Sequence, residues 1–63
     1  MNYLEEILKY EFTQSIEVYP LKKGGFNVVW YLFEPPKTIE RSCIRPKLED
    51  CLEFLYNSVV NNV

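Results

Sequence analysis

Histidine is absent from this 63-residue chain. The side chain that most often transfers protons near neutral pH is therefore missing, and neither cysteine has a histidine that could activate it as a nucleophile. Glycine is nearly as scarce. The pair Gly24-Gly25 lacks the G-x-x-x-x-G-K spacing and the strand-to-helix context of a phosphate-binding loop. We therefore predict that the protein is not an enzyme, with no catalytic residues and no cofactor.

The acidic side chains offer no catalytic pair either. An acid–base pair needs apolar surroundings to shift a pKa, and these carboxylates fall on the polar sides of predicted helices. We expect all of them to be solvated: Glu5, Glu6, Glu49, Asp50 and Glu53.

Only two cysteines are present, Cys43 and Cys51. The interpretation we favour is a pair of reduced, partly buried thiols. A disulfide would join a residue before the last helix to one a turn into it, which geometry allows. A zinc site would need further ligands in a chain without histidine, so we predict no metal.

Long apolar runs are missing as well. The longest, residues 28–33, is far shorter than the roughly 20 residues of a membrane span. Residues 1–6 lack the basic start and apolar stretch of a signal peptide, so we expect a cytoplasmic protein. The chain does have aromatic bulk, and each buried aromatic side chain removes roughly 150–250 Å² from water. We expect one small folded domain.

The first segment, residues 2–12, has helical spacing. Leu4, Ile7 and Leu8 fall at positions i, i+3 and i+4, which share one face of a helix. Asn2 is placed to cap the N-terminus. We therefore predict a helix whose apolar face consists of these three residues, with Tyr3 beside them.

Alternation predicts strands over residues 15–21 and 26–33. Gly24 and Gly25 supply the positive φ that a tight hairpin between them needs. Residues 38–44 alternate too, but neither of their faces is clearly apolar, so they predict a shorter third strand.

The last helix is predicted to start at Pro46, which lacks the N–H that the first helical position leaves unpaired, and to end near residue 60. Its apolar stripe consists of Leu48, Cys51, Leu52, Leu55 and Val59. This order leaves no room for a parallel crossover. It predicts one α+β domain over residues 1–63, with both helices on one face of an antiparallel sheet.

Residues 26–33 carry apolar side chains on both faces. One row consists of Phe26, Val28, Trp30 and Leu32, and the other of Asn27, Val29, Tyr31 and Phe33. A sheet with helices on one face buries only one row, and the second is either covered elsewhere by the chain or exposed. We expect exposure, because so short a chain has little left to cover it. We predict a partner-binding surface made of Tyr19, Val29, Tyr31 and Phe33.

Such a surface predicts a non-enzymatic protein–protein interaction module. It would serve as a small regulator, inhibitor or accessory subunit that binds another protein or a second copy of itself. Acidic helices would steer it towards a basic partner surface.

The net charge of −2 is unevenly distributed, because the acids concentrate near both ends of the chain. The middle holds most of the bases: Lys22, Lys23, Lys37, Arg41, Arg45 and Lys47. We expect these to form scattered surface pairs with the acids. Arg45 and Lys47, however, precede the last helix, where the dipole disfavours cations. That position would suit an anion-binding surface.

The element order, with bases in the hairpin and at the start of the second helix, is similar to that of double-stranded-RNA-binding domains. The resemblance implies nucleic-acid binding by these six bases as the alternative function. The family's lysine-rich run is represented only by Arg45 and Lys47, and its hairpin histidine is absent. Phosphate contacts supply most of the affinity for nucleic acid, so an acidic chain favours a protein partner.

Overall fold

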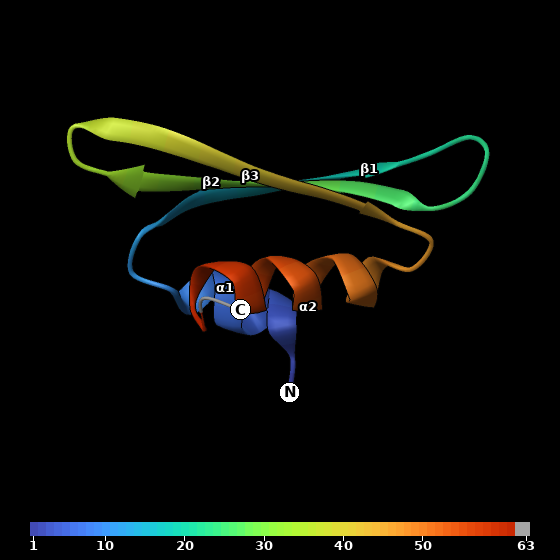
Figure 1. Cartoon of the computed structure of the whole chain (residues 1–63), viewed down its shortest axis with the longest axis horizontal. Helices are drawn as coiled ribbons and strands as arrows, with labels where there is room; N and C mark the ends of the chain where they lie inside the picture. Colours follow the sequence, from blue (N-terminus) through green and yellow to red (C-terminus); the bar gives the residue numbers. More distant parts are fainter. Residues whose placement is uncertain (62–63) are drawn as a thin grey trace.

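A computed structural model describes residues 1–61, and the last two residues of the predicted domain lie outside this part. In chain order it contains α1 (Tyr3–Lys9), β1 (Thr13–Pro20), β2 (Phe26–Glu34), β3 (Lys37–Arg45) and α2 (Leu48–Val59). The strands form one antiparallel sheet in the order β1-β2-β3. Figure 1 shows both helices on the same side of this sheet. The predicted α+β architecture is therefore confirmed.

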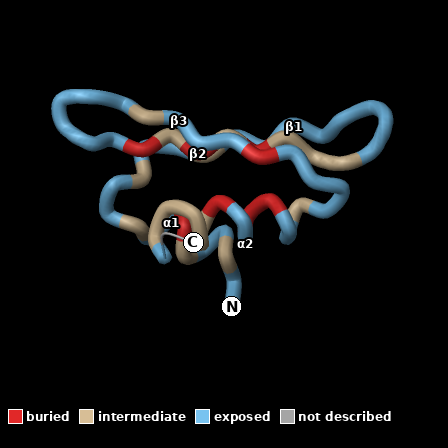
Figure 2. Tube along the Cα trace, in the orientation of Figure 1, coloured by how far each residue is buried: buried red, intermediate tan, exposed pale blue. Residues whose placement is uncertain are grey.

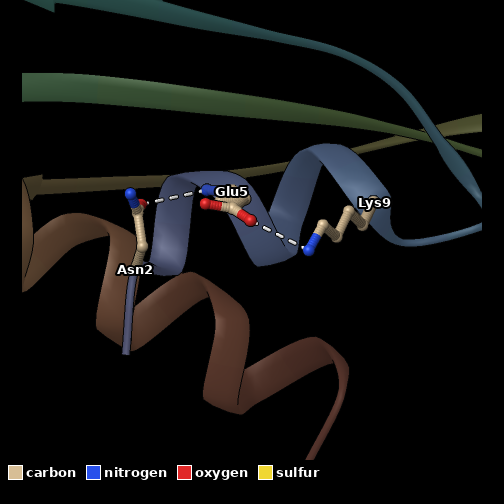
Figure 3. A network of polar contacts seen from close by, with 3 residues as sticks. All are labelled: Asn2, Glu5 and Lys9. Atoms are coloured by element: carbon tan, nitrogen blue, oxygen red, sulfur yellow. Dashed lines mark hydrogen bonds and ion pairs between the residues drawn. The ribbon is translucent and has the colours of Figure 1, made fainter.

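Polar contacts at the surface stabilise the short helix α1. The side-chain oxygen of Asn2 accepts a hydrogen bond from the Glu5 backbone N–H at 3.1 Å (Figure 3). Glu5 also forms an ion pair with Lys9, with 2.9 Å between Oε1 and Nζ. A capped N-terminus and a Glu-to-Lys pair at i,i+4 both favour helix, which is why this segment forms one.

The helix α1 is shorter than the predicted residues 2–12. It ends because Tyr10 is extended and the Thr13 N–H donates to the Tyr10 carbonyl at 3.0 Å, in a turn that leads into β1. Of the three residues predicted to share an apolar face, only Ile7 is buried, while Leu4 and Leu8 are 37% and 57% exposed. The buried part of this face is therefore narrow, because a seven-residue helix beside α2 presents only a small stripe to the core.

Thr13 connects α1, β1 and β2. Its hydroxyl donates to the Ile7 carbonyl and accepts a hydrogen bond of 2.9 Å from the Trp30 indole N–H. β1 therefore begins two residues before the predicted range of 15–21, and it ends at Pro20. A β-bulge between Thr13 and Ser15 shifts the register with β2.

The hairpin between β1 and β2 uses both glycines in the left-handed region, with φ of +100° at Gly24 and +90° at Gly25. A Cβ on Gly25 would lie 3.0 Å from the Arg45 carbonyl oxygen, whereas one on Gly24 would meet open space. The hairpin therefore lies against the end of β3.

The third strand is longer than the predicted residues 38–44. It runs over Lys37–Arg45 and pairs with β2 along this whole length. The alternation of apolar and polar residues is weak in β3 because it is an edge strand. On its helix side Cys43 is buried, whereas Arg41 and Arg45 are exposed.

The helix α2 begins at Leu48, so the prediction that it starts at Pro46 was wrong. β3 continues to Arg45, and Lys47 is still extended, with φ −115° and ψ 139°. Pro46 therefore belongs to the turn between strand and helix. The predicted apolar stripe is confirmed, since Cys51, Leu52 and Leu55 are buried.

The core lies between the sheet and the helices, where Figure 2 shows the buried segments of β2 and α2 facing each other. It consists of Ile7, Val28, Trp30, Leu32, Cys43, Cys51, Leu52 and Leu55. Both cysteines are free thiols, and the Cys51 sulfur lies 3.6 Å from the Cys43 carbonyl oxygen. Burial, with the neighbouring Cys51, raises the pKa of the Cys43 thiol.

Candidate interaction surface

The face of the sheet opposite the helices is called the open face. The pairing register places Tyr19 beside Asn27, Glu17 beside Val29 and Ser15 beside Tyr31. β3 completes the open face with Thr38, Glu40, Ser42 and Ile44, which pair with Phe33, Tyr31, Val29 and Asn27. All four residues predicted to bind a partner (Tyr19, Val29, Tyr31 and Phe33) therefore lie on this one face.

Exposure differs among these side chains. Tyr19 is 47% exposed and Phe33 46%, whereas Val29 and Tyr31 are partly buried by their neighbours in the sheet. Ile44, which does not belong to the predicted surface, is 59% exposed on the same face. Alternation alone put Ile44 in a row with Glu40 and Ser42, and only the register with β2 assigns that row to the open face.

A carboxylate lies among the aromatic residues of the open face. The Tyr19 hydroxyl donates to Glu17 Oε1 at 2.7 Å. Hydrogen bonding to the same carboxylate is the largest cause that raises the pKa of Tyr31, and it is also the largest cause for Tyr19. Glu17 was not selected from the sequence, because its role depends on the cross-strand position of Tyr31.

The charge of the open face is entirely negative. Glu17 and Glu40 lie on it, and none of its positions in the described strands carries lysine or arginine. Within residues 1–61 neither carboxylate forms an ion pair. At one end of the open face, the Thr38 hydroxyl donates a hydrogen bond to Gln14 Oε1 at 3.1 Å.

The six bases proposed for anion binding do not form one surface. Lys22 and Lys23 lie in the first hairpin, and Lys23 lines a shallow hollow together with Arg45. Lys37 starts β3 at the opposite end of the sheet from Arg45. The strand between these two residues is about 27 Å long at the usual rise per residue. Arg41 lines a separate hollow with Phe54 between β3 and α2.

The position of Arg45 before the helix N-terminus has a local explanation. Its guanidinium carbon lies 4.7 Å from the centre of the Phe54 ring, and Nη1 donates to the Ile44 carbonyl at 2.8 Å. A cation over an aromatic face is stabilised, which offsets the unfavourable dipole.

Among the described residues no group of three or more cysteine, aspartate or glutamate side chains is placed to hold a metal ion. None of the helices described is both long and apolar enough to span a membrane. Comparison with protein-family models, with characterised proteins and with solved structures found no match for this chain.

Proposed function

We propose that this domain is a non-enzymatic protein-interaction module that binds its partner, another protein or a second copy of itself, through the open face. The observation that carries the proposal is the placement of Tyr19, Phe33 and Ile44. Each is more than 45% exposed, on the face that neither helix covers.

The composition of the open face supports this function. Tyrosine and phenylalanine are enriched in the buried centres of protein interfaces, where they bring large contact area with few rotatable bonds. Polar side chains such as Ser15, Thr38 and Ser42 lie beside them on the open face, as in an interface with a polar rim.

A matched pair of phenylalanines tests the proposal. Phe33 on the open face and Phe54 on α2 are 46% and 47% exposed. Tagged wild type, Phe33→Ala and Phe54→Ala would be used to capture proteins from extracts of expressing cells, with quantitative mass spectrometry. We expect Phe33→Ala to lose partners that wild type and Phe54→Ala retain. Equal capture by all three variants would contradict the proposal.

A separate experiment tests whether the partner is a second copy of the chain. It measures the mass in solution by light scattering behind a sizing column, at micromolar protein concentration. If the partner is a second copy, the wild type has twice the mass of the chain and Phe33→Ala returns to the monomer mass. A dimer that persists in Phe33→Ala would show that another surface is used.

Nucleic-acid binding is the second candidate, because the fold brings Lys23 and Arg45 together beside the first hairpin. The net charge of −2 and the placement of Lys37 at the far end oppose it. Fluorescence anisotropy with duplex RNA at low salt tests this candidate. Binding that weakens steeply with salt, and is lost in Lys23→Glu, would favour it over the open face.

A further inference from the structure

We infer that the open face holds a site for an arginine side chain of the partner, centred on Glu17 between Tyr19 and Tyr31. This inference rests on the proposed function, and it names the chemistry of the group that the open face recognises.

The sheet register brings the three residues together. Glu17 and Tyr19 are two positions apart on β1, so both point to the open face. Tyr31 pairs with Ser15, which places it diagonally across from Glu17, within reach of an aromatic side chain. The result is a carboxylate flanked by two tyrosines, with Val29 directly opposite.

The Tyr19 hydroxyl orients this carboxylate and leaves part of it free. An ionised carboxylate offers about four acceptor sites, and two tyrosine hydroxyls occupy at most two of them. Glu17 is exposed, so the remaining sites face the solvent on the side where a partner would bind.

Charge complementarity selects a cation. The carboxylates of Glu17 and Glu40 have no basic neighbour on the open face, among the residues that the structure describes. Covering them with an apolar partner surface would remove them from water without compensation, which is costly. A partner that buries Tyr19, Val29 and Tyr31 therefore has to supply a positive charge beside Glu17.

A guanidinium group fits these neighbours better than an ammonium group. It is planar, donates two parallel hydrogen bonds to a carboxylate, is less strongly hydrated and stacks on aromatic rings. Glu17 supplies the carboxylate, Tyr19 and Tyr31 supply the rings, and Val29 supplies an apolar contact for the aliphatic stem.

The test is an NMR titration of the ¹⁵N-labelled chain with three blocked tripeptides. Each has two leucines, and the central residue is arginine, its uncharged isostere citrulline, or lysine. The protein variants are wild type, Glu17→Gln and, as a matched carboxylate that accepts from a tyrosine away from the open face, Glu53→Gln.

We expect the arginine peptide to shift the backbone amide resonances of Glu17, Val29 and Tyr31. It should bind wild type and Glu53→Gln about three- to tenfold more tightly than the citrulline peptide. In Glu17→Gln this preference should disappear.

Other outcomes separate the two proposals. Equal binding of the arginine and citrulline peptides at the open face would overturn the arginine site and leave the interaction surface intact. Equal binding of the lysine peptide would overturn the assignment to a guanidinium. If no peptide shifts open-face resonances, the arginine site is also overturned, and the capture experiment with Phe33→Ala decides the proposed function.

Discussion

The two faces of β2 carry similar side chains and have different environments. Val28 and Trp30 are fully buried, whereas Val29 and Tyr31 are only partly buried and Phe33 is 46% exposed. β-branched and aromatic residues favour a strand on either face, so strand propensity does not choose between the rows. The helices decide which row is buried, because both of them lie on the same side of the sheet (Figure 1). An apolar row can therefore form part of a strand without being part of the core.

Substitutions at Trp30 and Phe33 give the largest expected contrast between the faces. Trp30→Ala should cost about 3–5 kcal/mol, since it removes a fully buried indole. A chain of 63 residues has a total stability of about 3–9 kcal/mol, so this variant should lose at least about a third of it. Phe33→Ala should cost about 1 kcal/mol. Urea denaturation followed by circular dichroism measures both. If Phe33→Ala unfolds as Trp30→Ala does, the open face belongs to the core and the interaction surface is refuted.

Substitutions at Thr13 test how its hydrogen bonds connect α1 to the buried face of β2. Thr13→Val keeps the shape of the side chain but removes the acceptor of the Trp30 N–H and the donor to Ile7. A buried donor without a partner costs about 1–3 kcal/mol, so the urea midpoint should fall accordingly. Thr13→Ser keeps the hydroxyl and is the control. An unchanged urea midpoint in Thr13→Val would contradict this role of the hydroxyl, and a loss in Thr13→Ser alone would assign the stabilisation to packing of the methyl group.

Much of this contrast follows from the sequence. The α+β order, the hairpin at Gly24-Gly25 and the inward stripe of α2 were predicted from spacing alone, because helices and strands repeat with different periods. The row containing Tyr31 and Phe33 was also separated correctly from the row containing Trp30, since alternation fixes which residues share a face.

What the sequence did not provide depends on contacts between segments. Leu8 has the spacing of a core residue and is exposed, because the position of α1 beside α2 decides which stripe is buried. Ile44 joined the candidate surface only through the register of β3 with β2, and the register of β1 with β2 placed Glu17 diagonally across from Tyr31. The same applies to Arg45, whose contact with Phe54 bridges the turn before α2.

Substitution of Ile44 tests the open face with little expected change in the free energy of unfolding. Because its side chain is 59% exposed on an edge strand, Ile44→Thr should change the free energy of unfolding by less than about 0.5 kcal/mol. Threonine keeps the β-branched shape and removes apolar area from the open face. Capture of partners should therefore weaken while the urea midpoint stays unchanged. Unaltered capture would restrict the interaction surface to β1 and β2.

The smallest effect, with no expected change in fold, concerns the titration of the tyrosines. The pKa values of Tyr19 and Tyr31 are raised above 10.0, first by hydrogen bonding to Glu17, whereas that of Tyr3 is raised first by burial and then by Glu53. A phenol whose pKa is higher in the folded state stabilises the fold below the unfolded pKa, and this contribution is lost as the pH rises through the folded pKa.

Glu17→Gln should therefore lower the pKa of Tyr19 and Tyr31 towards 10.0 and leave that of Tyr3 raised. NMR of the tyrosine ring carbons across alkaline pH resolves the three residues, and Glu53→Gln is the control that should move Tyr3 alone. If Tyr31 does not respond to Glu17→Gln, the carboxylate is not shared between the two tyrosines. The open face would then lack the oriented charge that distinguishes it from a purely apolar surface.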